Sequence, residues 1–94
     1  MVPFNVELSE GVKFYREILP MKVRIQLDAF LDALAYNPEP LEAEFLDEDP
    51  DGTRYLRIWI ENHRVYYVIE RDSENHLVVF VYLFVAGRLD IELD

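Results

Sequence analysis

The sequence contains no cysteine, only three glycines and few basic residues. Without cysteine there is no disulfide framework, no thiolate metal site and no cysteine nucleophile, which fits a reducing compartment. The glycines are isolated, so no glycine-rich phosphate loop is present. No apolar run reaches the ~20 residues that span a bilayer, and the longest, 77–86, has the length of a strand. We therefore expect a cytoplasmic protein with no membrane segment.

Acidic residues outnumber basic ones by nineteen to nine, which gives a formal net charge of −10. This charge opposes binding to nucleic-acid phosphates and to anionic membranes, and it favours a basic partner. It also keeps a small protein in solution, which is the simpler interpretation. The 94 residues are 51% apolar and 14% aromatic. That length and composition predict a single domain over residues 1–94 with one packed core.

The first half of the chain predicts a strand followed by a helical hairpin. Residues 4–8 alternate between apolar and polar side chains, the period of a half-buried strand. Ser9 is a suitable N-cap for a helix that Pro20 ends. A second helix is predicted up to Asn37-Pro38, because apolar residues recur along it with a helical period: Val23, Leu27, Phe30, Leu31 and Leu34.

The second half predicts strands. Residues 39–52 are acidic, and we interpret them as an exposed connection with a short ordered piece around Phe45. Three strands follow, over 54–61, 64–70 and 77–85, and short polar turns between them indicate an antiparallel meander. The predicted fold class is α+β with the order β-α-α-β-β-β, in which the helical hairpin packs on an antiparallel sheet.

Metal and cofactor patterns are incomplete. Residues 47–52 match the opening of a calcium loop, D-x-D-x-D-G, but the twelfth position, which needs a bidentate glutamate, is Ile58. The alternative is a solvated acidic turn, and the sequence leaves cation binding there open. His63 and His76 have no second ligand at a diagnostic spacing. We expect no resident metal and no cofactor.

Arginines are the most informative polar residues in the second half. Arg54 and Arg57 have opposite parity on the first meander strand, Arg64 begins the second strand, and Arg88 follows the third. Antiparallel pairing brings Arg88 towards Arg64, where two guanidinium groups beside Tyr66 or Tyr67 are able to hold a phosphate. The alternative is that each arginine pairs with one of the many surface carboxylates.

The segment 54–70 has a strand with basic residues, a tight turn and a second strand that begins at His63 and Arg64, continues with two positions of apolar type and reaches Tyr67. It resembles the central signature of the RelE/ParE toxin superfamily. The upstream helical hairpin and the apolar strand after 77 are similar too. This resemblance implies the toxin component of a type II toxin–antitoxin system, bound by a small antitoxin. RelE-like members cut messenger RNA on the ribosome without a metal, and ParE-like members poison DNA gyrase. The resemblance implies phosphate-stabilising roles for Arg64, Arg88 and Arg57, with Arg54.

Some residues depart from this pattern. No Tyr or His follows Arg88, so His63, beside Arg64, is the candidate acid or base. The net charge of −10 disfavours the ribosome and messenger RNA as targets. Three functions therefore stay open: a toxin with metal-independent endoribonuclease activity, a non-catalytic protein-interaction domain on the same scaffold, and a ParE-like toxin that targets gyrase. The charge predicts an antitoxin-like partner that is basic at its contact surface, and a homodimer also remains open.

Overall fold

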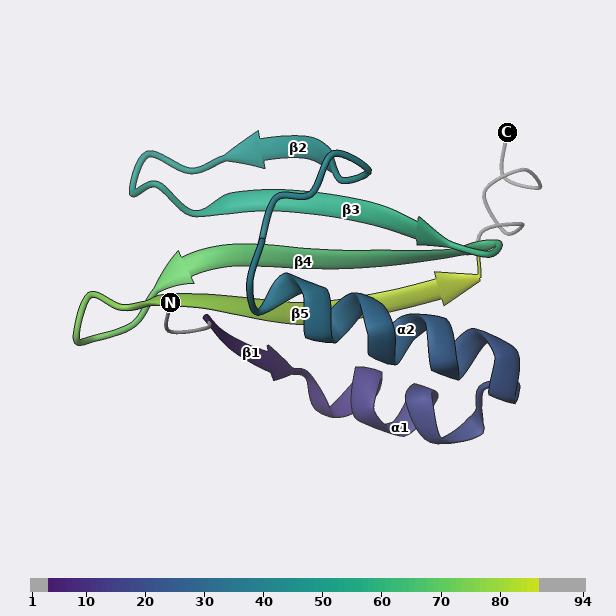
Figure 1. Cartoon of the computed structure of the whole chain (residues 1–94). Helices are drawn as coiled ribbons and strands as arrows, with labels where there is room; N and C mark the ends of the chain where they lie inside the picture. Colours follow the sequence, from purple (N-terminus) through teal and green to yellow (C-terminus); the bar gives the residue numbers. More distant parts are fainter. Residues whose placement is uncertain (1–3, 87–94) are drawn as a thin grey trace.

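The computed structural model describes residues 4–86, and these form two helices and five strands (Figure 1). In chain order the elements are β1 (Asn5–Leu8), α1 (Glu10–Ile18), α2 (Met21–Leu34), β2 (Glu44–Glu48), β3 (Arg54–Ile60), β4 (His63–Arg71) and β5 (Leu77–Ala86). Neither of the two described helices is long and apolar enough to cross a membrane. The predicted α+β class and the helical hairpin are confirmed.

The five strands form one sheet in the order β1-β5-β4-β3-β2. The pairs β2–β3, β3–β4 and β4–β5 are antiparallel, and the last two form the predicted meander. The sheet is therefore mostly antiparallel, in agreement with the predicted fold class, and its β1–β5 pair is parallel. The long crossover through the helices and three more strands separates β1 from β5 in the chain, and a parallel pair requires such a connection.

Strand β2 adds a strand to the predicted order. It lies within residues 39–52, where the sequence predicts an exposed connection with a short ordered piece around Phe45, and this ordered piece is a strand of the sheet. Every residue of β2 is exposed, so the strand has no buried face. Its sequence therefore lacks the alternation of apolar and polar residues by which a strand is predicted. It pairs with β3 at the edge of the sheet, with a register shift between Phe45 and Asp47. Its acidic side chains suit an edge strand, since charge there opposes pairing with another sheet.

Ser9 caps α1, as predicted, and also ties the helix to the sheet. Its hydroxyl accepts a hydrogen bond from the backbone N–H of Val12 (3.2 Å) and donates one to the backbone oxygen of Tyr82 (3.2 Å). The backbone N–H of Ser9 donates to the oxygen of Val81 (2.9 Å). One residue thus satisfies a free N–H of the first helical turn and fixes the start of α1 on β5.

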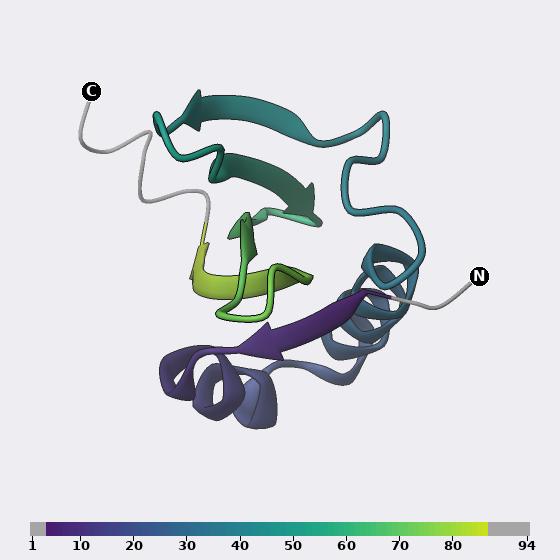
Figure 2. The same ribbon diagram turned by 90° about the vertical axis from the view of Figure 1, so that its left-hand side faces the viewer.

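The core lies between the helical hairpin and one face of the sheet. Figure 2 shows both helices gathered beside β1, away from β2. The predicted apolar face of β3 is confirmed, since Leu56, Ile58 and Ile60 are buried in this core. Tyr67 is completely buried there, and its hydroxyl donates to the backbone oxygen of Pro38 (2.8 Å). Burial raises the pKa of Tyr67, so this hydroxyl stays protonated and available as a donor.

An ion pair joins the two helices. The guanidinium group of Arg16 on α1 donates through Nε to Oδ1 of Asp28 (2.7 Å) and through Nη2 to Oδ2 (2.8 Å). These hydrogen bonds lower the pKa of Asp28 from its ordinary value of 3.8. A carboxylate whose pKa is lower in the folded state stabilises the fold above its unfolded pKa, and this contribution is lost as the pH falls through the folded value.

We expect Asp28→Asn to lower the free energy of unfolding near neutral pH, and to matter less as the solution is acidified below about pH 4. Urea denaturation of both proteins between about pH 7 and pH 3 measures the difference. Asp32→Asn is the matched control, because Asp32 is on the same helix and has no ion pair within residues 4–86. A pH-independent difference between wild type and Asp28→Asn contradicts the assigned role of the pair.

Candidate functional site

The candidate site is the sheet face opposite the helices. Side chains alternate between the two faces along a strand. Because Leu56 and Ile58 of β3 and Val65 and Tyr67 of β4 point into the core, the residues between them point the other way. We call this surface the open face and define it by six residues: Tyr55, Arg57, Trp59, Arg64, Tyr66 and Tyr82.

Two of the predicted arginines meet on the open face around one tyrosine. Arg57 pairs with Tyr66 in the β3–β4 register, and Arg64 lies two residues before Tyr66 on the same strand. The guanidinium carbons of Arg57 and Arg64 lie 5.9 Å and 5.6 Å from the centre of the Tyr66 ring. Arg64 Nη1 also donates to the Tyr66 hydroxyl (2.7 Å). The sequence left the choice between Tyr66 and Tyr67 open, and the geometry selects Tyr66.

Glu44, on the edge strand β2, binds Arg57 at two points. Nε of Arg57 donates to Oε1 of Glu44 (2.9 Å) and Nη2 donates to Oε2 (3.3 Å). These hydrogen bonds lower the pKa of Glu44 and, together with the hydrogen bond to Tyr66, raise the pKa of Arg57. Both groups are therefore charged over the physiological range. The interpretation of the arginines as surface ion pairs holds for Arg57.

Tyrosines extend the open face on both sides of Tyr66. The rings of Tyr66 and Tyr82 lie 6.3 Å apart between centres, and burial raises the pKa of Tyr82. The hydroxyl of Tyr55 donates to Oδ2 of Asp49 (2.7 Å), and this hydrogen bond, with burial, raises the pKa of Tyr55 to about 12. Tyr55 and Tyr82 thus act as neutral hydroxyl groups at neutral pH, while Trp59 on the same face is 48% exposed.

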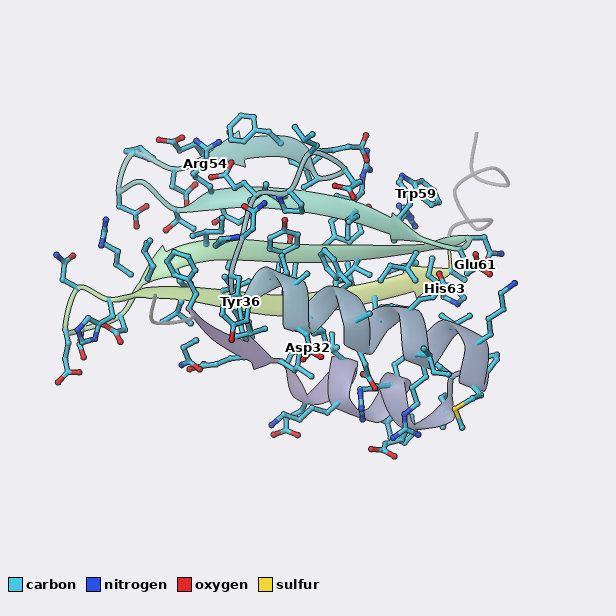
Figure 3. All side chains as sticks on the ribbon, viewed as in Figure 1. Asp32, Tyr36, Arg54, Trp59, Glu61 and His63 are labelled. Carbon is cyan, nitrogen blue, oxygen red and sulfur yellow. The ribbon has the colours of Figure 1, made fainter. Side chains whose placement is uncertain are left out.

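Arg54 is separated from Arg57 and Arg64. It has the parity of Leu56, so it lies on the helix side of the sheet, and Figure 3 shows it at the opposite end from His63. Its guanidinium group contacts two carboxylates, Glu48 (2.6 Å) and Glu39 (3.0 Å), and lies 4.6 Å above the centre of the Phe45 ring. The hydrogen bond to Glu39 is the main cause of its raised pKa. Arg54 therefore takes no part in the geometry of the open face.

His63 also lies on the helix side, although it is adjacent to Arg64 in the sequence. The centre of its ring lies 5.0 Å from the ring centre of Phe84 and 6.4 Å from that of Tyr15 on α1. Its Nδ1 is buried and has no hydrogen-bond partner within residues 4–86. The sequence-predicted acid or base is thus not brought together with the two arginines. Arg88, the other predicted site residue, lies outside the described residues.

In two acidic turns, carboxylates accept hydrogen bonds from backbone N–H groups of nearby residues. In the segment 47–52, the backbone N–H of Thr53 donates to Asp51 (3.0 Å) and that of Glu48 donates to Asp47 (2.8 Å). Between β4 and β5, exposed Asp72, Glu74 and His76 bring potential ligand atoms within 4.8 Å of one another. One oxygen of Asp72 already accepts two backbone N–H groups (2.9 Å each), as in an ordinary Asx turn.

Two solved structures are similar to this chain over nearly its whole length. The archaeal RelE in its complex with RelB, from Pyrococcus horikoshii OT3, superimposes with a TM-score of 0.77 at 20% identity, covering 90% of this chain and 96% of that chain. The chain has the RelE fold. The E. coli toxin RelE in the free state, as a double arginine-to-alanine mutant, gives a TM-score of 0.62 at 22% identity, covering 97% of this chain and 90% of that chain. The resemblance stated from the sequence is thereby confirmed for the fold.

Comparison of the sequence alone does not detect this similarity. No protein-family model matches it, and no curated protein does either. Within the RelE fold, the sequence indicates Arg57 and Arg64 and leaves the choice between Tyr66 and Tyr67 open. It does not indicate Glu44, because the strand that carries Glu44 is not predicted. Strand parity was available as a signal for His63: it has the same parity as buried Val65, so it points away from Arg64.

Proposed function

We propose that this chain is the toxin-type component of a toxin–antitoxin pair. The observation that carries the proposal is the match to the archaeal RelE of the RelE–RelB complex, over 90% of this chain. The placement of Arg57 and Arg64 around Tyr66 supports it further, because both arginines were assigned from the RelE-like segment of the sequence. Arg88 completes the proposed set of phosphate-stabilising residues.

The proposed partner is a small antitoxin-like protein with a basic contact surface. Residues 39–51, which we call the acidic segment, contain no Lys or Arg and seven acidic residues: Glu39, Glu42, Glu44, Asp47, Glu48, Asp49 and Asp51. Strand β2, at the centre of this segment, is exposed throughout. A partner with Lys and Arg side chains complements this surface, and complementary charge speeds association.

This function predicts a salt-sensitive complex. We expect the tagged chain to retain the product of a short reading frame beside its gene when the two are co-expressed, and to release it as salt rises from about 50 mM to about 500 mM. Glu42→Gln combined with Asp47→Asn is expected to weaken retention, since neither side chain has an ion pair within residues 4–86. Failure to retain any such product contradicts the proposal, and salt-insensitive retention contradicts the basic contact surface.

Glu44 favours the second candidate function, a protein-interaction domain without catalysis. Its carboxylate occupies both donors of Arg57 that face it, and His63 lies on the other side of the sheet. A metal-independent endoribonuclease needs free cationic groups at the phosphate and an acid or base beside them. A homodimer is the alternative to a complex with an antitoxin-like partner. If the chain forms a homodimer, light scattering of the isolated protein gives twice its mass of 11.2 kDa.

A further inference from the structure

The ion pair between Glu44 and Arg57 is built like a contact between an arginine and a bound anion. The two strands place the residues directly opposite each other, and the carboxylate accepts from Nε at 2.9 Å and from Nη2 at 3.3 Å. A phosphate group engages a guanidinium in the same two-point manner. The place of an anion at Arg57 is therefore filled by a side chain of the same molecule.

Aromatic rings surround this arginine. Tyr66 lies beneath both Arg57 and Arg64, Tyr82 lies next to Tyr66, and Trp59 is half exposed on the same face. Proteins that bind single-stranded nucleic acids combine cationic groups that contact the backbone with aromatic rings that stack on the bases. An acidic peptide has no bases to stack, so this combination points to RNA and not to a carboxylate-bearing protein.

We propose that Glu44 takes the place of an RNA phosphate at Arg57 and so holds the open face in a state that binds single-stranded RNA weakly. Glu44 is then a specificity-determining residue that lowers the affinity of the open face for nucleic acid. The inference rests on the proposed function in its choice of RNA as the ligand. It depends on two side chains from adjacent strands, and both are partly exposed, at 47% for Glu44 and 27% for Arg57.

Fluorescence anisotropy with a labelled single-stranded RNA at low salt tests this proposal. We expect Glu44→Gln to increase the affinity on the order of 10-fold, and to steepen the dependence of log K on log salt by about 0.7, the value for one added phosphate contact on a single strand. Glu48→Gln is the matched control. It removes the same charge from the same strand, but Glu48 pairs with Arg54 on the helix side, so its affinity is expected to stay near that of the wild type.

A double substitution tests whether the gain in RNA affinity depends on Arg57. Glu44→Gln combined with Arg57→Ala is expected to return the affinity to the wild-type level or below it. Equal gains from Glu44→Gln and Glu48→Gln would overturn the proposal, because they would show a general effect of net charge. An unchanged affinity in Glu44→Gln would overturn it as well.

A poly-glutamate peptide of matched charge distinguishes the ligand classes. We expect Glu44→Gln to gain much less affinity for this peptide than for RNA, and an equal gain overturns the assignment to RNA. The partner experiment is independent of these measurements. Loss of the partner complex with an intact RNA response contradicts the toxin–antitoxin function, whereas a partner complex without an RNA response contradicts the role of Glu44.

Discussion

Leu27→Ala is expected to destabilise the protein by about 2–5 kcal/mol, because deleting a buried leucine side chain removes its transfer free energy and leaves a cavity. Leu27 is completely buried at the centre of α2, where the helix packs on the sheet. For a domain of this size, each kcal/mol lowers the midpoint of thermal unfolding by about 4–8 °C. Differential scanning calorimetry measures this shift directly.

Leu41→Ala is the matched control for this prediction. Leu41 is fully exposed in the connection before β2, so the same chemical change there is expected to alter the free energy of unfolding by less than about 0.5 kcal/mol. Similar shifts for the two variants would mean that the hairpin does not pack on the sheet as described. That result would remove the framework on which the open face depends.

The second large effect concerns catalysis. We expect the chain to cleave ribosome-bound messenger RNA at least about 100-fold more slowly than a RelE-type toxin measured beside it, because general acid–base help typically contributes ~10²–10⁴ in rate. Residues 89–94, which follow Arg88, include no Tyr or His, and His63 packs against Phe84 on the helix side. Toe-printing of programmed ribosomes, with the chain expressed without a partner, measures this activity.

Arg64→Ala is the control for that experiment. Robust codon-dependent cleavage by the wild type that disappears in Arg64→Ala would contradict the prediction. It would show that the arginines of the open face suffice for catalysis despite the Glu44–Arg57 pair and the net charge of −10. A tyrosine of the open face would then be the remaining donor for the leaving oxygen.

Elements with a buried face were predictable from the sequence. The alternation of β3, the apolar stripe of α2 and the Ser9 cap each reflect burial or hydrogen bonding that a local pattern records. Around Phe45 the sequence predicts a short ordered piece but not a strand, since all five residues of β2 are exposed. Its pairing depends on the backbone of β3, which a pattern of side chains does not record.

The site was predictable only in part. The RelE-like segment indicates Arg57 and Arg64, whereas the sequence leaves the choice between Tyr66 and Tyr67 open. In the structure both guanidinium groups lie over the ring of Tyr66. The contact between Glu44 and Arg57 was not predictable, because it joins residues 13 positions apart through a strand with a shifted register. A single shift there moves every following side chain to the other face. Longer-range pairing of this kind is fixed by the whole sheet and not by local sequence.

The most direct test of the central claim, that this chain is one half of a toxin–antitoxin pair, is calorimetric titration with the purified product of any short, antitoxin-like reading frame found beside its gene. The account predicts a saturable complex of defined stoichiometry with a Kd below roughly 1 μM, and a Kd that rises with salt. A flat titration at concentrations well above this Kd, with both proteins folded, would contradict the account.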